Sequence, residues 1–274
     1  MRAKNMTLCF VEFILLSAAC LMGQSWKLPQ GASVKESGSR TYRFTVDYST
    51  ADIHGRIIEL QRVQGDYTRG LPGNKAAWEN VAIAQTTQAG GPLGPPQKRE
   101  FMNGFQYDRK SFDPLAPDFF KGFPDMAVNE RNLVWDTAMI ENFGQEQFEH
   151  LVLNQPYHFS TDQDVNMPGV GKFHNRDVQL MWAGKSHRNG QDCALIEYNA
   201  YFNPLEMAVG GMTFKGRSHY WGQIWVSLKT RQIEYGTLYE DVLGEVKFPG
   251  SNAAQVINVF RYGIFEPLVN RGEK

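Results

Sequence analysis

Apolar and polar residues alternate along many short segments of this chain, and a period of two predicts β-strands. The clearest case is RTYRFTVDYST (40–50), where four bulky side chains fall on one face: Tyr42, Phe44, Val46 and Tyr48. The segment 54–70 continues the pattern, with Gly55 and Gly65 as expected bends or bulges. A third strand is expected at 77–86, although alanines weaken the pattern there.

One segment follows the helical period instead. Between residues 130 and 154, five apolar residues recur near one face: Leu133, Ile140, Phe143, Phe148 and Leu151. This spacing predicts a helix near 130–152 that covers the core, with Gly144 as the position where it can break. Upstream, residues 113–125 are rich in turn formers and phenylalanine and are expected to pack onto the sheet.

From residue 176 onward the pattern predicts an antiparallel meander that ends with a strand at 255–265. Asn189-Gly190 is a strong hairpin signal, because a type I′ turn needs positive φ at both central residues. A two-residue loop there predicts four pairs: Arg188 with Gln191, His187 with Asp192, Met181 with Tyr198 and Trp182 with Glu197. A second turn at Thr230-Arg231 predicts three more: Val226 with Tyr235, Ile224 with Thr237 and Trp225 with Gly236.

These elements predict a mostly β protein with one long helix, arranged as a large antiparallel curved sheet or half-barrel packed on that helix. The 26 glycines and 13 prolines among 274 residues suit strands joined by many turns. The length is sufficient for a sizeable core, and we expect one domain over residues 40–268. Charge is almost balanced, with 28 Lys and Arg against 29 Asp and Glu, so no basic field points to nucleic acid.

Residues 1–23 have the pattern of a secretory signal peptide. Arg2 and Lys4 precede an apolar run, 13–23, that is too short to span a bilayer. We therefore expect a periplasmic or secreted protein with no transmembrane segment in the mature chain, and a disordered lead-in over 24–39. The alternative is a lipid anchor on Cys20, because LSAAC resembles a bacterial lipobox.

Cysteine and histidine offer little chemistry beyond that segment. Cys193 is the one cysteine after residue 23, so no internal disulfide is expected, and its apolar neighbours predict a small buried side chain. The six histidines form no His-x-x-x-His or His-Glu-x-x-His motif. We therefore expect no metal site and no cofactor.

A mixed aromatic and polar face is the main functional signal. On the predicted register, side chains of two neighbouring hairpins share one side of the sheet, and seven of them are candidate ligand-binding residues: Trp182, Glu197, Tyr201, Arg217, His219, Trp221 and Trp225. Glu234, Leu238 and Glu240 are expected opposite them. Such a lining is typical of a ligand groove. The alternative is that the helix and the segment 113–125 cover this face, with Arg217 and His219 paired beneath them.

The segment NPLEMAVGGMTFKG (203–216) carries five apolar side chains around Gly210-Gly211: Leu205, Met207, Val209, Met212 and Phe214. A methionine-containing apolar segment with a glycine hinge suits a lid or an adaptable contact surface. The same pattern also fits a hairpin arm that packs into the core.

Three phrases, FHNRDVQL (173–180), NGQDCALIEY (189–198) and HYWGQIWVSL (219–228), resemble those of secreted bacterial proteins with no assigned role. In architecture, a signal segment followed by many antiparallel strands around one long helix resembles the half-barrel carriers of lipoproteins and lipids in the bacterial envelope (the LolA/LolB type). The resemblance covers residues 40–265 and has no diagnostic motif. It implies a non-enzymatic binding protein whose partner is an apolar or amphipathic small molecule or an envelope protein.

The alternative function is a secreted hydrolase in which His219 acts with Glu197 or Glu240 from an adjacent strand. Ser218 is not expected to act as its nucleophile, because successive side chains of a strand point to opposite faces of the sheet. The sequence predicts no complete catalytic site.

Overall fold

The computed structural model describes residues 28, 38–86, 88–167, 170–251 and 253–268. The predicted signal peptide (1–23), the Cys20 anchor and nearly all of the predicted lead-in (24–39) lie outside these ranges. Across the described ranges, no helix has both the length and the apolar character needed to cross a membrane.

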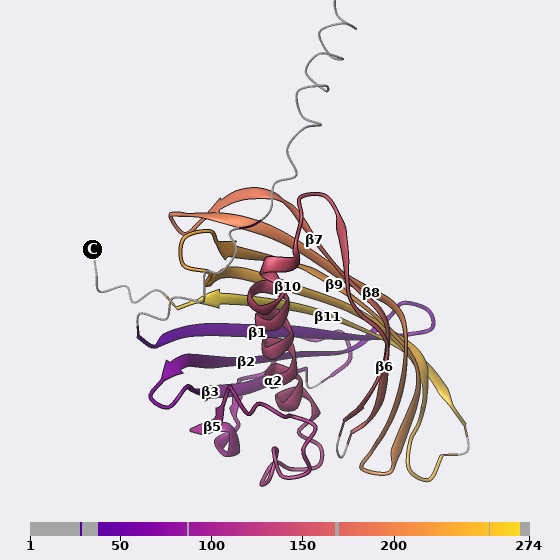
Figure 1. Ribbon diagram of the computed structural model, residues 1–274. Helices are drawn as coiled ribbons and strands as arrows, with labels where there is room; N and C mark the ends of the chain where they lie inside the picture. Colours follow the sequence, from indigo (N-terminus) through magenta and orange to yellow (C-terminus); the bar gives the residue numbers. More distant parts are fainter. Residues whose placement is uncertain (1–27, 29–37, 87, 168–169, 252, 269–274) are drawn as a thin grey trace, which may run out of the picture.

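Eleven strands form one curved antiparallel sheet, and an α-helix lies across its concave face (Figure 1). The strands are β1 (Arg40–Asp52), β2 (Ile57–Leu71), β3 (Lys75–Gln85), β4 (Gln97–Lys98), β5 (Phe105–Asp108), β6 (Pro156–Met167), β7 (Gly171–Arg188), β8 (Gln191–Val209), β9 (Met212–Ser227), β10 (Ile233–Lys247) and β11 (Gln255–Pro267). The helix is α2 (Val128–Glu141); shorter helical turns are η1 (Glu100–Met102), η2 (Asn142–Glu146) and η3 (Phe148–His150).

The strand order is β4-β3-β2-β1-β11-β10-β9-β8-β7-β6, and β5 pairs with β3 outside this path. The pairing of β1 with β11 joins the N-terminal strands to the C-terminal meander, which the sequence alone leaves open. The predicted fold class is confirmed: the protein is mostly β, with one long helix in the described part of the chain and a large antiparallel curved sheet.

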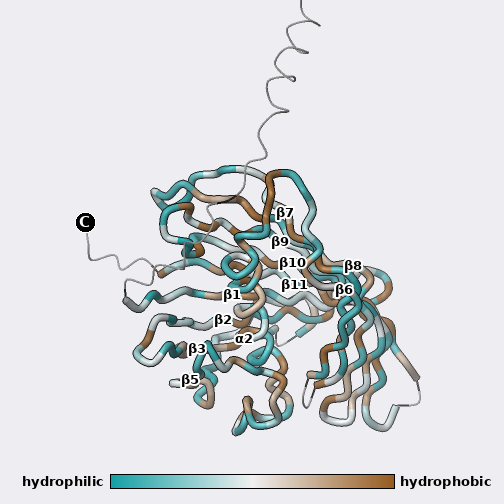
Figure 2. Tube along the Cα trace, viewed as in Figure 1, coloured by the Kyte–Doolittle hydropathy of each residue, from teal (hydrophilic) through white to brown (hydrophobic). Residues whose placement is uncertain are grey.

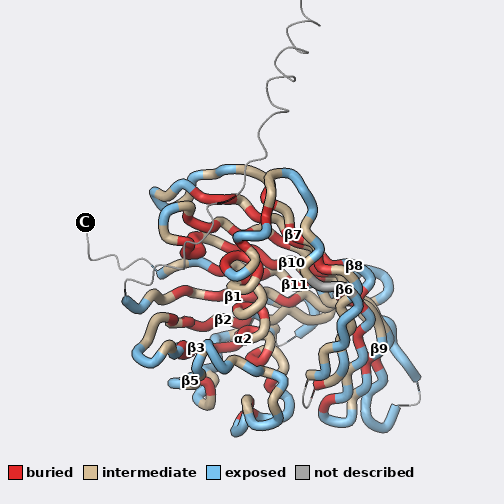
Figure 3. The backbone as a smooth tube through the Cα atoms, viewed as in Figure 1, coloured by how far each residue is buried: buried red, intermediate tan, exposed pale blue. Residues whose placement is uncertain are grey.

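The alternation along β1 buries one side of the strand on the concave face, as predicted. The four predicted side chains are at most 7% exposed: Tyr42, Phe44, Val46 and Tyr48. Figure 2 shows the same alternation of apolar and polar residues along neighbouring strands, and Figure 3 places the buried residues around α2. Burying a large apolar side chain stabilises a fold by about 1.5–3 kcal/mol. The apolar side chains buried between this face and α2 therefore stabilise the packing of the helix on the sheet.

The helix is shorter than the predicted range 130–152. It ends at Glu141, and the chain continues through the π-helical turn η2 and the 3-10 turn η3. Gly144 lies in η2 against β9, where a Cβ atom would sit 3.0 Å from the Ile224 side chain. The missing side chain therefore lets the turn approach the sheet. The five predicted apolar residues are all buried: Leu133 and Ile140 on the helix, and Phe143, Phe148 and Leu151 beyond its end.

The Asn189-Gly190 hairpin forms as predicted at its turn, where both residues have positive φ. Arg188 pairs with Gln191 and His187 with Asp192. Farther from the turn the predicted register is wrong, because the register shifts between Trp182 and Gly184. Trp182 consequently pairs with Ile196, and Met181 takes the place opposite Glu197. A β-bulge adds one residue to a strand and so reverses the faces of the residues beyond it.

The predicted register of the next hairpin is wrong for the same reason. The turn spans Leu228–Arg231, and a further shift lies between Ile233 and Tyr235. Val226 therefore pairs with Ile233, and Trp225 with Tyr235. As a result Glu234, Leu238 and Glu240 are not opposite the tryptophans. The residues opposite the β9 outer side chains are Tyr235, Thr237, Tyr239 and Asp241.

Glycines allow the sheet to bend beyond the end of α2. Gly216 of β9 and Gly244 of β10 are directly paired on the concave face. A Cβ atom on Gly216 would lie 2.2 Å from the Leu243 carbonyl oxygen, which no side chain can accommodate. Strand glycines of this kind mark bends. The strands continue past this point into the curved hairpins at the lower right of Figure 1.

Candidate functional site

A cavity of about 600 Å³ lies between α2 and the concave face of the sheet. This volume falls within the range of roughly 300–1,000 Å³ that is typical of small-molecule pockets. The walls come from α2 and η2, from strands β6 to β11, from Tyr48 of β1 and from a short loop segment at 113–115. The cavity is therefore assembled from parts that are far apart in the sequence.

Apolar side chains form most of the lining at the hairpin ends of the strands. Four residues there make a second, smaller hydrophobic cluster: Leu205, Phe214, Val242 and Val246. Partly exposed apolar residues surround it: Met167, Phe173, Met207, Met212, Ile257 and Val259. Three unbranched methionines line the same wall, and such side chains adapt to ligands of different shape. The methionine-containing arm 203–216 thus contributes to the cavity, as a β8–β9 hairpin with its turn at Gly210-Gly211.

A charged cluster lines the part of the cavity beneath α2. The Arg261 guanidinium donates hydrogen bonds to Asp136 of α2 and to Glu240 of β10. The Ser218 hydroxyl donates to the other oxygen of Glu240, with 2.5 Å between the oxygens. Arg261 also lies over the Tyr48 ring, 5.1 Å from its centroid. The ion pairs thereby connect the helix to the sheet.

Strand pairing explains why these groups meet. Tyr48, Arg261, Glu240 and Tyr220 form one row across β1, β11, β10 and β9, on the concave face. Asp136 faces this row from α2. Arg261, Glu240 and Asp136 are each less than 10% exposed, so their charges are stabilised by one another rather than by water.

Burial changes the protonation of this cluster. It raises the pKa of Asp136 to about 6, against the opposing effect of the Arg261 charge, and Glu240 raises it further. Burial alone would lower the pKa of Arg261, but Asp136, Tyr48 and Glu240 outweigh that effect and raise it. Burial also raises the pKa of the Tyr48 hydroxyl to about 12. At neutral pH Asp136 is therefore a carboxylate, Arg261 a guanidinium and Tyr48 an uncharged phenol.

The ionisable groups of the cavity lining are carboxylates, phenols and one guanidinium. No histidine or cysteine is among the described residues that line it. Nor do the described residues contain three or more His, Cys, Asp or Glu side chains placed to hold a metal ion. The Ser218 hydroxyl, which faces the same side, is fully buried and donates to a carboxylate that Arg261 already neutralises.

The seven candidate residues predicted from sequence are divided between the two faces of the sheet. Trp182 is on the concave side, 2% exposed, in the core outside the cavity lining, where its indole donates to the Gly184 carbonyl. The other six project from the convex face, opposite the cavity: Glu197, Tyr201, Arg217, His219, Trp221 and Trp225. They therefore do not form one groove with Trp182. Ligand binding by the convex face stays a prediction.

Contacts within the convex face occupy many of its aromatic rings. Trp221 stacks on Tyr239, and Tyr239 stacks on Tyr262, with centroids 5.8 and 5.0 Å apart. Trp225 packs against Tyr235, and Arg188 lies 3.7 Å from the centre of the Tyr235 ring. These rings cover one another, which leaves less ring surface for a ligand.

The polar candidates on the convex face are also paired or enclosed. Arg217 forms an ion pair with Asp241 at 3.2 Å, and Gln223 donates to Glu197 at 3.0 Å. The His219 ring lies edge-on to Tyr201 and Phe202, and burial lowers its pKa.

The predicted hydrolase pairs do not form. Glu240 projects from the concave face, whereas His219 projects from the convex face opposite Asp241. Glu197 shares the convex face with His219, but its partner Gln223 is four residues away along β9, roughly 13 Å at the rise of a strand. Neither carboxylate therefore lies within hydrogen-bond distance of the imidazole.

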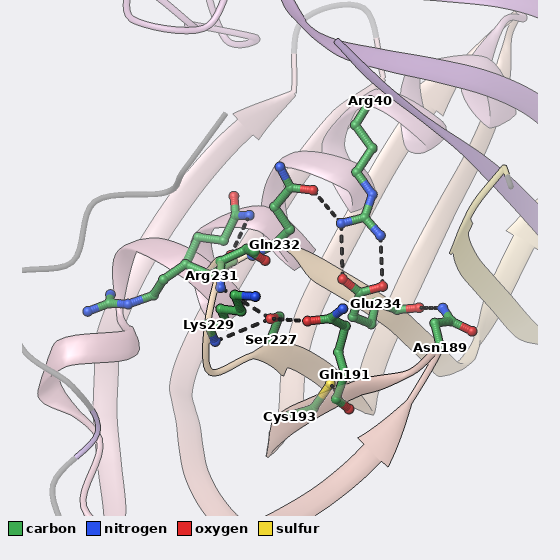
Figure 4. Close-up of polar contacts among 11 residues, drawn as sticks. Arg40, Asn189, Gln191, Cys193, Ser227, Lys229, Arg231, Gln232 and Glu234 are labelled. Atoms are coloured by element: carbon green, nitrogen blue, oxygen red, sulfur yellow. Dashed lines mark hydrogen bonds and ion pairs between the residues drawn. The ribbon is translucent and has the colours of Figure 1, made fainter. Parts of the chain in front are cut away.

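A second polar cluster lies at the other end of the sheet, around the turns of the two hairpins (Figure 4). Arg40 forms a bidentate pair with Glu234, with nitrogen–oxygen distances of 2.7 and 3.1 Å, and also donates to Gln232. Asn189 donates to the Glu234 carbonyl. Cys193 nearby is fully buried, as predicted, and burial raises the pKa of its thiol to about 11. These contacts join the turns to β1, and the Cys193 thiol is buried beside them.

Asp136, Arg261 and the cavity role of Glu240 are not among the features predicted from the sequence. One signal was present: the concave positions of the last strand read Ile257, Val259, Arg261, Gly263 and Phe265. A single charge on an otherwise apolar face predicts a buried ion pair, because an unpaired charge there is strongly unfavourable. The partner on α2 has no comparable signal.

No family model matches the sequence, and no curated protein matches it. The solved structures to which the chain is similar include one described as lipid–protein interactions in lipovitellin, with a TM-score of 0.45 and 9% identity over 86% of this chain and 26% of that chain. They also include a putative AttH from Nitrosomonas europaea, with a TM-score of 0.21 and 9% identity over 88% of this chain and 98% of that one. The chain thus spans about a quarter of the lipovitellin chain.

Proposed function

We propose that the protein binds an apolar or amphipathic small molecule in the cavity between α2 and the concave face of the sheet, as a non-enzymatic binding protein. The observation that carries the proposal is the cavity of about 600 Å³ with its apolar wall at the hairpin ends and charged cluster under the helix. A ligand with a hydrocarbon part and a polar end matches both regions.

The apolar wall is sufficient to provide affinity. Each methylene group moved out of water contributes about 0.8 kcal/mol. Association costs an estimated 4–15 kcal/mol or more in lost freedom, so about five to nineteen methylene groups are needed before binding becomes favourable. A molecule with a chain of this length is therefore the smallest ligand that we expect to bind well.

Binding of a neutral fluorescent probe, N-phenyl-naphthylamine, to the wild type and to two variants tests the proposal. Val242→Trp would fill the cavity, whereas Leu243→Trp places the same side chain on the opposite face of β10. We expect Val242→Trp to weaken probe binding by about tenfold or more, because the tryptophan and the probe compete for one space. Leu243→Trp should bind like the wild type. Equal binding by all three proteins, or none by the wild type, would contradict the proposal.

We further propose that the chain is exported to the periplasm or secreted, on the basis of the charged start and short apolar run in residues 1–23. N-terminal sequencing and intact mass of the protein from the producing cell test this. We expect cleavage near Gly23. Acylation of a new N-terminal Cys20 would instead show a lipid anchor, and an uncleaved N-terminus would contradict export by a cleaved signal.

A further inference from the structure

We infer that the cavity selects a single-chain amphiphile with an uncharged, oxygen-bearing head, such as a long-chain alcohol, over the fatty carboxylate of the same length. The inference deepens the proposed function and rests on it. Two independent features of the cavity support it: hydrogen-bond donors without acceptors, and an excess of negative charge.

Three residues that line the cavity have buried donor atoms with no hydrogen-bond acceptor among the described residues: the Tyr48 hydroxyl, the Arg261 Nε–H group and the Trp135 indole N–H. The Asn132 side chain hydrogen-bonds with the Tyr48 oxygen and lowers the pKa of the hydroxyl, as a donor to that oxygen does, so it does not accept the phenol proton. A buried donor left unsatisfied costs about 1–3 kcal/mol. A ligand oxygen that accepts from one of these groups would recover that free energy.

Tyr48 and Arg261 are the central pair of donors. They are directly paired between β1 and β11, and the guanidinium lies over the phenol ring. Tyr48 and Arg261 are each 7% exposed, so a ligand oxygen reaches their donor atoms only when a neighbouring side chain of the cavity wall moves aside. An oxygen atom between α2 and this row is therefore the expected position of the head.

The charge of the lining opposes an anionic head. Its charged residues are Asp136, Glu240, Arg261 and, at the exposed rim, Asp113. Three carboxylates against one guanidinium give a net charge of −2 when all are ionised. Arg261 already donates to both Asp136 and Glu240, so it is not free to neutralise another carboxylate.

An alcohol head fits these groups better than the charged alternatives. Its oxygen can accept from Tyr48 or Arg261, while its own proton can be donated to a carboxylate. A fatty carboxylate would be buried beside two carboxylates without a free cation. An alkylammonium would relieve the negative charge but has no lone pair to accept from the unpaired donors.

Competition against N-phenyl-naphthylamine at neutral pH tests the inference with dodecanol, dodecanoate and dodecylammonium, all below their aggregation concentrations. We expect dodecanol to displace the probe at a concentration about tenfold lower than either charged compound. Similar displacement by all three, or preferential displacement by dodecanoate or dodecylammonium, would overturn the inference while leaving the proposed function intact. Absence of probe binding would overturn both.

Two tyrosines on the same strand supply matched variants. Tyr48→Phe and Tyr42→Phe each remove the hydroxyl of a buried tyrosine, but only Tyr48 lines the cavity. Both variants should fold, because each keeps the buried ring and loses only one hydroxyl group. We expect Tyr48→Phe to weaken dodecanol binding by about fivefold, as one neutral hydrogen bond contributes about 1 kcal/mol. Tyr42→Phe should match the wild type for both compounds. Equal dodecanol affinities in the two variants would remove Tyr48 as a head-group contact and contradict the inference.

Discussion

The two faces of β9 carry similar kinds of side chain in different surroundings. Tyr220 and Ser218 project from the concave face, where Tyr220 lines a cavity and Ser218 supports the buried Glu240. Trp221 and His219, their neighbours in sequence, project from the convex face, where rings from adjacent strands pack against them. Aromatic and polar residues are therefore found together on both faces, but the large cavity adjoins the concave one.

The difference shows that a mixed aromatic and polar composition does not by itself identify a binding site. On the convex face, aromatic rings stack on one another across β9, β10 and β11. On the concave face, a cavity separates part of α2 from the strands that it faces. Unfilled space next to unsatisfied polar atoms is the feature that indicates a ligand.

The largest expected contrast between the faces concerns their ion pairs. Arg261→Met would leave Asp136 and Glu240 buried without their cation, so we expect the free energy of unfolding to fall by about 3–5 kcal/mol. Arg62→Met breaks a pair with Asp47 on the convex face, whose side chains are 46% and 38% exposed. That loss should be about 0–1 kcal/mol. Urea denaturation of both variants measures the difference, and equal losses would contradict the assignment of Arg261 to a buried cluster.

The pH dependence of stability gives a second contrast. Because the pKa of Asp136 is raised from 3.8 to about 6, the folded protein holds a proton that the unfolded chain has lost in this window. The contribution of Asp136 to the free energy of unfolding therefore falls as pH rises from about 4 to about 6, by roughly 3 kcal/mol in total.

Asp136→Asn cannot titrate, so we expect the variant to become more stable relative to the wild type as pH rises through the same window. Urea denaturation at several pH values measures this difference. Parallel pH profiles for the two proteins would show that Asp136 has an ordinary pKa and is not buried beside Glu240.

The smallest expected effects come from replacing Trp221 or Tyr220, which are adjacent in β9, in separate variants. Trp221→Leu removes the stacking on Tyr239 and should lower the free energy of unfolding by about 1 kcal/mol, without changing probe binding. Tyr220→Leu alters the cavity wall and should change the probe affinity by a factor of about three to ten. A loss of probe binding in Trp221→Leu would support the convex face as the binding surface instead.

The comparison of the faces also shows how far the sequence predicts this structure. Regular alternation assigned Tyr42 to Tyr48 to the buried face correctly, and the positive-φ pair Asn189-Gly190 fixed the first pairs of its hairpin. The bulges beside Trp182 and Glu234 have no comparable sequence signal. Each reverses the faces that follow, which is why Trp182, Glu234 and Glu240 were expected on the side of Trp221.

The site was less predictable than the fold for a physical reason. The arm 203–216 was recognised from its methionines and its Gly210-Gly211 turn, because both are local features. The cavity itself depends on where α2 crosses the sheet, and therefore on packing between segments more than a hundred residues apart, such as Asp136 and Arg261. No local sequence pattern indicates which distant segments pack against each other.

Photo-cross-linking with a diazirine-bearing long-chain alcohol tests most directly which face of the sheet binds the ligand. After irradiation, peptide mass spectrometry identifies the labelled residues. We predict labels on the wall of the cavity, at Met207 and Met212 of the β8–β9 arm and at Met167 of β6. Labels concentrated on Trp221, Tyr239 and Phe260 of the convex face, with none on the methionines, would contradict this account.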